Sequence, residues 1–232
     1  MLGDLYGRCL RPLSAVGAVR LRGRHFYLLL LLLCLVPALA GLGRLLELFA
    51  GRAVTLENAR FFASPLPVVV HIVTSLVFVV GGVGQFCFAG FAGQTVWHRR
   101  GGRILALAGL LAALSGVWMT LFYPPAVANF DGPLLFWIRL GVGAAMVLAV
   151  CRAVVLARQR DFARHRDWMI RAYALGLGAG TQVFTHIPWF IFPELRGELL
   201  RVLCMGAGWG INVLVAEFLI QKLRSTAFLR RV

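Results

Sequence analysis

The chain alternates between long apolar runs and short arginine-rich stretches, a pattern that predicts helices crossing a membrane. Six apolar runs stand out, at residues 26–43, 66–91, 104–123, 133–157, 169–192 and 202–220. Each is close to the roughly 20 residues that a helix needs to cross a hydrocarbon core of about 30 Å. Continuous apolar runs favour helices over a barrel, because a helix satisfies its backbone hydrogen bonds within itself. We predict an all-α integral membrane bundle of six transmembrane helices within residues 26–220.

Composition supports the membrane class. Of the 232 residues, 60% are hydrophobic and only 14% are charged. A water-soluble domain of this length cannot bury so much apolar side chain, which excludes a soluble enzyme. The same composition is the opposite of the disordered class, which is poor in aromatic residues and rich in charge.

Basic residues set the expected orientation, because Lys and Arg near the ends of spans are retained in the cytoplasm. Most of the 24 lie in a basic arm (1–25), a basic tail (221–232) and the loops around Arg99 and Arg160. The exceptions are Arg44, Arg52, Arg60, Arg139, Arg196 and Arg201. We therefore expect both termini in the cytoplasm. The net charge of +15 then indicates contact with anionic headgroups, and no nucleic-acid partner.

The first apolar run has a second interpretation. Arg20, Arg22 and Arg24 precede a leucine run, and Ala-Leu-Ala before Gly41 fits a signal-peptide cleavage site. The long basic arm favours retention of this run as a membrane helix. Cleavage would leave five spans with unchanged orientation.

Three polar residues are expected at one depth in the membrane. His71 lies five residues into the second run, Arg139 six residues into the fourth, and His186 six residues before the end of the fifth. At 1.5 Å per residue each is about 8 to 9 Å below the outer boundary. A residue that can ionise at such depth is a functional hypothesis by default.

This layer matches haem chemistry, since two histidines on facing helices can ligate haem iron while an arginine pairs with a propionate. We expect His71 and His186 to be ligands of haem b, with Arg139 balancing charge. Gln85 and Gln182 share helix faces with the two histidines. A quinone or other headgroup site, a proton relay and ordinary packing of each histidine remain open alternatives.

A second set of polar residues opens two helices on the cytoplasmic side. His98-Arg99 with Gly102-Arg103 precedes the third run, and His165-Arg166 with Trp168 and Arg171 precedes the fifth. Fixed cations at helix starts oppose the helix dipole, so a bound anion, an acidic partner or internal carboxylates are expected nearby. The candidate internal partners are Asp167 and Glu217, with Asn212 further along the last run.

The order of these residues resembles a bacterial family of membrane proteins, domain of unknown function 2306. The resemblance covers about residues 65–220, and its most specific part is the second His-Arg motif. It implies no activity. It marks as family-like positions His71, His98, Arg99, Gly102, Arg103, His165, Arg166, Trp168, Arg171, Asn212 and Glu217. The multi-helix layout is also distantly similar in architecture to cytochrome b561-type haem proteins.

The sequence leaves two classes of function. The first is an inner-membrane protein that binds haem b or a quinone and passes electrons to a redox partner. The second is a non-redox membrane protein, either a small-molecule or lipid binder or a structural subunit, that uses the layer of His71, Arg139 and His186 as a polar site. No nucleophile with a neighbouring base appears at one depth, so a hydrolase is not expected; whether the protein is an enzyme stays undecided.

Overall fold

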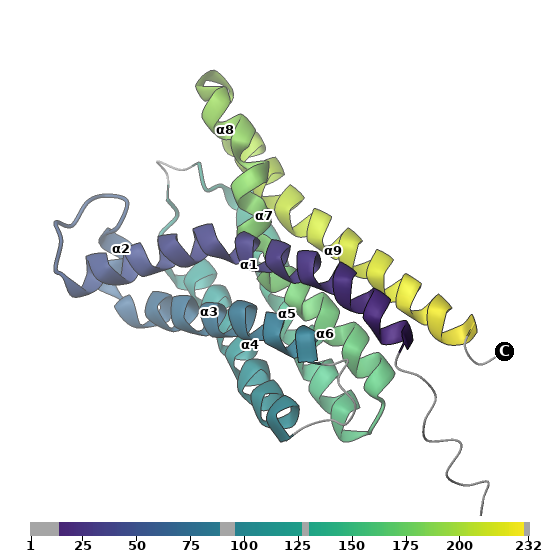
Figure 1. Ribbon diagram of the computed structural model, residues 1–232. Helices are drawn as coiled ribbons and strands as arrows, with labels where there is room; N and C mark the ends of the chain where they lie inside the picture. Colours follow the sequence, from purple (N-terminus) through teal and green to yellow (C-terminus); the bar gives the residue numbers. More distant parts are fainter. Residues whose placement is uncertain (1–13, 89–95, 127–129, 230–232) are drawn as a thin grey trace, which may run out of the picture.

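The structure is a bundle of α-helices. A computed structural model describes residues 14–88, 96–126 and 130–229, and no strand occurs within these ranges. The helices and one 3₁₀ turn are, in chain order, α1 (Ser14–Phe49), α2 (Ala59–Ala63), α3 (Pro65–Phe88), α4 (Val96–Phe122), α5 (Pro133–Arg158), α6 (Phe162–Gly176), α7 (Gly178–Thr185), α8 (Ile187–Ile191), η2 (Pro193–Leu195) and α9 (Glu198–Leu229). Figure 1 shows α1 and α3 running side by side, at an angle to α4, α5 and α9.

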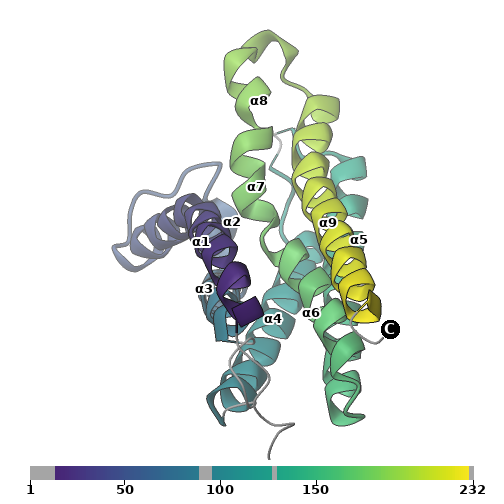
Figure 2. The same cartoon turned by 45° about the vertical axis from the view of Figure 1, so that its right-hand side comes forward.

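Among the described residues, five helices are long and apolar enough to cross a membrane: α1, α3, α4, α5 and α9. The expectation of an all-α membrane bundle is confirmed. The run at 169–192 is different, because α6, α7 and α8 follow one another there in place of one continuous helix. Figure 2 shows these segments stacked end to end beside α9.

The chain itself explains where this helix breaks. Gly176 and Gly178 flank the break between α6 and α7, and glycine is a weak helix former. α7 ends at Thr185, and Pro188 follows in the first turn of α8, where its missing N–H is tolerated. The apolar pattern alone did not reveal these interruptions, since the run as a whole stays mainly hydrophobic across both of them.

Asn212 of α9 holds the two sides of the first break together. Its Nδ2 donates to Ala174 O in α6 at 3.1 Å, and its Oδ1 accepts from Thr181 Oγ1 in α7 at 2.7 Å. Asn212 thus gives one backbone carbonyl at the break a donor and one side-chain hydroxyl an acceptor, as polar groups inside a membrane require. This gives a structural role to one family-like position.

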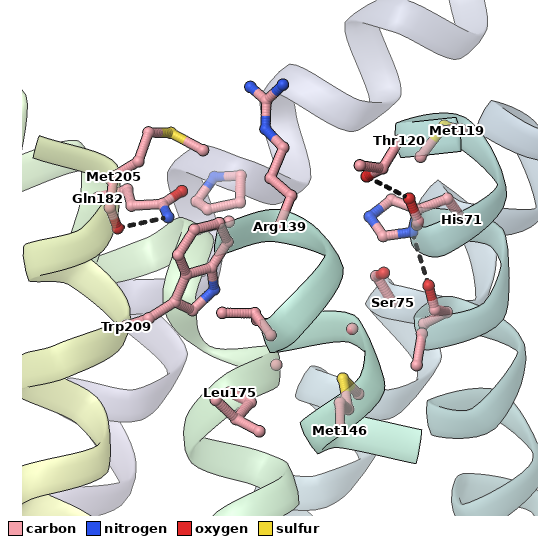
Figure 3. A pocket seen from close by; sticks show the side chains of 18 of the residues that line it. His71, Ser75, Met119, Thr120, Arg139, Met146, Leu175, Gln182, Met205 and Trp209 are labelled. Atoms are coloured by element: carbon pink, nitrogen blue, oxygen red, sulfur yellow. Dashed lines mark hydrogen bonds between the residues drawn. The ribbon is translucent and has the colours of Figure 1, made fainter. Parts of the chain in front are cut away.

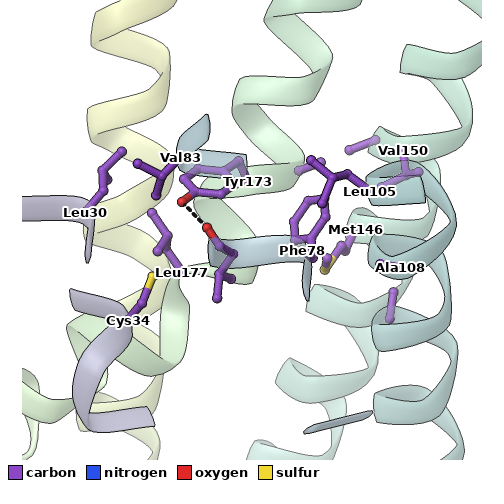
Figure 4. Close-up of a cluster of buried hydrophobic side chains, with 14 residues drawn as sticks. Leu30, Cys34, Phe78, Val83, Leu105, Ala108, Met146, Val150, Tyr173 and Leu177 are labelled. Carbon is purple, nitrogen blue, oxygen red and sulfur yellow. Dashed lines mark hydrogen bonds between the residues drawn. The ribbon is translucent and has the colours of Figure 1, made fainter. Parts of the chain in front are cut away.

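The core lies where α1, α3, α4, α5 and α6 meet, around the rings of Phe78 and Tyr173 (Figure 4). Phe78 is 1% exposed, and Tyr173 donates from its hydroxyl to Val79 O at 2.6 Å. Gly109 faces the Phe78 ring so closely that an added Cβ would come within 2.7 Å of it. Close approach of helices through small residues is the ordinary packing mode in membranes.

The outer surface of the bundle is apolar and suits contact with lipid. Large side chains such as Leu32, Leu46, Leu214 and Phe218 are each about 60% exposed or more. Such a surface would be a liability in water. In a bilayer it contacts acyl chains, as expected for an integral membrane protein.

Candidate ligand-binding cavity

The bundle forms a partly open cavity of about 750 Å³, lined by residues of α1 to α7 and α9. Its wall is mainly apolar, with Leu33, Pro37, Ile72, Leu76, Val142 and Met146 among the lining residues. Figure 3 shows Arg139, His71 and Gln182 around its upper part, and Met146 and Leu175 below. The polar groups therefore gather toward one end. We call this end of the bundle, where α2 and Asp131 lie, the Asp131 end.

His71 enters the cavity wall from α3. Its Nδ1 lies 2.9 Å from Ala112 O and 3.3 Å from Ser115 Oγ, both on α4. A carbonyl oxygen only accepts, so Nδ1 carries the proton and Nε2 is left with its lone pair. Nε2 faces the interior of the cavity (Figure 3). The Gly116 backbone beside the ring leaves space for it, since a Cβ there would stand 3.3 Å from His71 Cε1.

Arg139 also lines the cavity. Its guanidinium is paired with the carboxylate of Asp131, a residue that the sequence pattern did not single out. Its two terminal nitrogens donate to Asp131 at 2.9 and 3.1 Å, a bidentate pair. Arg201 of α9 approaches the same carboxylate, with Nε 3.7 Å from Asp131 Oδ1. Phe130, just before Asp131, has a φ of +55°, a strained conformation for this residue. Its ring is held by Trp189, with ring centroids 5.7 Å apart.

Arg60 of α2 adds a further positive charge to the cavity wall. It donates through Nη1 to Pro124 O at 3.2 Å, and its guanidinium lies over the Phe61 ring. Burial lowers the pKa of the Arg60 guanidinium; Asp131 opposes this, and the positive charge of Arg139 adds to it. Among the described residues no group accepts a hydrogen bond from its buried Nε.

Tyr123 links two chain segments at the Asp131 end through its hydroxyl. Its hydroxyl donates to Ser64 O at 2.5 Å, which ties the end of α4 to the start of α3. Burial raises the pKa of the Tyr123 phenol, so it remains a neutral donor at physiological pH. The edge of its ring packs on Phe61 beneath Arg60.

His186 lies outside the cavity wall. Its Nδ1 donates to Gln182 O at 2.7 Å, and its Nε2 accepts from Arg201 Nη1 at 3.1 Å. Both ring nitrogens are therefore engaged within the protein. His186 lies between α7 and α8, and its ring is turned toward Gln182 of α7 and Arg201 of α9. The structure does not bring His186 to the cavity beside His71.

The two glutamines differ in position. Gln182 lines the cavity and donates through Nε2 to Met205 O at 3.1 Å, joining α7 to α9. Gln85 lies at the other end of α3, against Gly101 at the start of α4. Of the residues expected at a cofactor, the structure gathers His71, Arg139 and Gln182 at one cavity and leaves Gln85 and His186 apart.

The remaining motif residues form a cluster at the other end of the bundle, which we call the Asp167 end. Asp167, only 2% exposed, accepts from Arg166 Nη2 and from Arg224 Nε of α9, each at 2.9 Å. Arg171 binds Glu217 through two hydrogen bonds of 2.5 and 2.8 Å. Asp167 and Glu217 are thus internal partners of the arginines. They join α6 to α9.

The histidines at the Asp167 end lie near each other. His98 at the start of α4 is close enough to His165 of α6 for their charges to interact. His165 donates through Nδ1 to Ala153 O of α5 at 2.8 Å. Nearby Arg99 and Arg103 are exposed, and Gly102 packs beside Gln85. Within the described residues, no group of three or more His, Cys, Asp or Glu side chains has a geometry to hold a metal ion.

Sequence reasoning missed three residues of the Asp131 end: Asp131, Arg60 and Arg201. Arg60 and Arg201 were noted only as exceptions to the orientation rule. The sequence did contain a signal for the two arginines. Arginines are uncommon on the non-cytoplasmic side of a membrane protein, so those found there often have a specific structural or functional role. Asp131 is a lone acid in the short segment between two spans, eight residues before Arg139.

Comparison with known proteins places the chain in a family without assigning it an activity. A family model described as a predicted membrane protein, DUF2306, matches residues 68–220. Neither the curated proteins nor the solved structures gave a match. The matched segment runs from α3 to α9 and contains the cavity-lining residues His71, Arg139 and Gln182. The chain belongs to the DUF2306 family of membrane proteins.

Proposed function

We propose that this integral membrane protein binds an amphipathic small molecule in the cavity, with the polar head of the molecule at the Asp131 end. One observation carries the proposal: an apolar cavity of about 750 Å³ collects its polar side chains at a single end. Small-molecule sites commonly measure about 300 to 1,000 Å³ and combine an apolar wall with a few convergent polar groups. We place the protein in a bacterial inner membrane with the Asp131 end facing away from the cytoplasm.

The polar groups define what the head must offer. His71 Nε2 accepts a hydrogen bond, so a hydroxyl of the ligand suits it. Arg60 and Arg139 donate, so oxygen acceptors suit them. An isoprenoid quinone or quinol meets both requirements, with an apolar tail for the α1 side of the wall. This supports the quinone interpretation of the layer as well as that of a non-redox lipid binder.

Co-purification tests the proposal. The protein, purified in a mild non-ionic detergent, is expected to carry an amphipathic molecule detectable by native mass spectrometry and solvent extraction. Ser75→Phe fills the cavity from α3 and is expected to remove this molecule. Val73→Phe is the matched control, because Val73 is 45% exposed on the same helix and does not line the cavity. Equal amounts of bound molecule in both folded variants would refute the proposal.

A second candidate, haem b with His71 as one axial ligand, is supported by the orientation of that ring. Metal-bound histidines usually donate their other ring N–H to a carbonyl or carboxylate, which fixes the tautomer. His71 has this arrangement, with Nδ1 bonded to Ala112 O and Nε2 toward the cavity. The cavity also presents Met119, Met146 and Met205, whose thioethers are known axial ligands.

Absorption spectroscopy separates this candidate from the first. If haem is bound, the purified protein is expected to be red and to show b-type absorption bands after reduction with dithionite. These bands should be lost in His71→Ala. They should remain in His165→Ala, because His165 lies at the Asp167 end. Colourless protein from haem-replete cells excludes haem and leaves the binding of another amphipathic molecule as the sole proposal.

A further inference from the structure

The charged residues of the cavity wall point to the class of ligand. Those that line it are Arg60, Arg139 and Asp131. Arg201 stands behind Asp131 and shares its carboxylate. One buried carboxylate, 6% exposed, therefore serves two arginines and stands near a third. Positive charge exceeds negative charge at the polar end of an otherwise apolar cavity.

Other carboxylates near this end do not remove the excess. Glu47 is engaged by Arg44 and by Asn58 Nδ2, on the α1 side of the loop. Glu198 at the start of α9 is exposed, and its Oε1 lies 3.4 Å from Leu134 N. Neither lines the cavity.

Of the two arginines that line the cavity, Arg60 is the one with donors to spare; the Nε of Arg201 also lacks an acceptor, but Arg201 does not line the cavity. The one hydrogen bond of Arg60, through Nη1, goes to a backbone carbonyl, which carries no charge. Its Nε is buried, and the described residues offer it no acceptor. Partial burial of a cation that hydrogen-bonds to no carboxylate of its own is unfavourable, and a hydrogen-bonded anion relieves the cost. An arginine fork binds carboxylate and phosphate groups through two parallel bonds.

We propose that the cavity takes an anionic amphiphile: a carboxylate or phosphate head held by Arg60 and Arg139, on a single apolar chain that lies along α1, α3 and α5. This inference rests on the proposed function and narrows it to one class of ligand. The charge selects the head, and the apolar wall between Ile72 and Met146 selects the chain.

Equilibrium binding with matched ligands tests the inference. Detergent-purified full-length protein is titrated with a fluorescent long-chain carboxylic acid, the alcohol of the same chain, the corresponding alkyl phosphate, and inorganic phosphate. We expect the acid and the alkyl phosphate to bind at least about tenfold more tightly than the alcohol, since a charge-assisted hydrogen bond in a mainly apolar site contributes about 1.4 kcal/mol or more. We expect no measurable binding of inorganic phosphate.

Each other result has a defined meaning. Equal affinity for acid and alcohol overturns the anionic head and leaves the proposed function standing. Binding of none of the chain-bearing ligands overturns both. Inorganic phosphate binding as tightly as the alkyl phosphate also overturns the inference, because it shows a free-anion site that does not use the apolar wall.

Substitutions of Arg60 test where the polar head of the ligand binds. Arg60→Gln is expected to weaken binding of the acid about tenfold and to leave that of the alcohol unchanged, while Arg60→Lys, which keeps the charge, loses less. Arg52→Gln is the matched control, an exposed arginine in the loop that precedes α2, which does not line the cavity. Melting temperature and gel filtration verify folding of each variant. Unchanged affinity for the acid in folded Arg60→Gln contradicts the assignment.

Discussion

The two ends of the bundle use the same residue types in different ways. At the Asp167 end, Asp167 receives bonds from Arg166 and Arg224, and Arg171 is paired with Glu217. All these charged groups have partners within the protein. At the Asp131 end, one carboxylate is shared by Arg139 and Arg201, and the charges face a cavity.

The difference shows why residue type alone does not assign a role. A cluster that satisfies itself joins helices, as the Asp167 end joins α6 to α9. A cluster with donors left over beside an apolar cavity is suited to bind a ligand. The two ends therefore predict different responses to mutation and to ligand.

The largest effect is expected in the core that lies between the two ends. Phe78→Ala removes a ring that is 1% exposed and leaves a void against Gly109, so we expect the free energy of unfolding to fall by about 3 to 5 kcal/mol. Unfolding in mixed micelles measures it. Phe218→Ala, at a side chain that is 63% exposed, is the control and is expected to change little. A similar loss in both variants would show that the core assignment is wrong.

Next in size is the loss of the carboxylate at the Asp167 end. Asp167→Asn removes the counter-charge of Arg166 and Arg224, and we expect a loss of about 2 to 3 kcal/mol in the free energy of unfolding. Ligand affinity should remain that of the parent protein, and added ligand should raise the stability of both proteins equally. A large change in affinity would contradict a purely structural role for this end.

Asp131→Asn sharpens the comparison, because here a ligand can replace the missing charge. Without ligand we expect a loss of about 1 to 2 kcal/mol, as Arg139 and Arg201 lose their partner. A long-chain carboxylic acid should stabilise Asp131→Asn more than the parent and so close most of the gap between them, whereas the gap between Asp167→Asn and the parent should stay the same. Thermal unfolding at several acid concentrations measures both. Failure of the acid to rescue stability counts against an anion site at this end.

The smallest effect is expected at the break between α6 and α7. Asn212→Ala removes the bonds to Ala174 O and Thr181 Oγ1, and we expect about 1 kcal/mol of destabilisation. Because Thr181 then lacks its acceptor, Thr181→Ala in the same background should add little further loss. A double-mutant cycle on melting in detergent tests this coupling. Additive losses would mean that Asn212 does not act through Thr181.

The sequence predicted the membrane class and the long helices well, because an apolar run of about 20 residues matches the thickness of a bilayer. It did not predict the division of the fifth run into α6, α7 and α8. Glycines are common in membrane helices, so Gly176 and Gly178 do not by themselves mark a break. His186 was expected beside His71 because the two residues lie at similar distances from the ends of their runs, and such a count does not fix which way a side chain faces.

The candidate site was predicted in part for a related reason. His71, Arg139 and Gln182 were recognised because polar residues within apolar runs are conspicuous. Asp131, Arg60 and Arg201 lie at span ends or in loops, where charge is ordinary, and only packing reveals that they meet. The Arg171–Glu217 pair was accessible because Glu217 is a lone acid within the last apolar run.

Binding of a long-chain carboxylic acid to the purified parent protein, Ser75→Phe and Val73→Phe is the decisive test of the cavity. We predict saturable binding of one molecule per chain to the parent and to Val73→Phe, with at least about a tenfold loss of affinity in Ser75→Phe. Equal affinity in all three folded proteins, or uptake that rises only with the amount of detergent, would contradict ligand binding in this cavity.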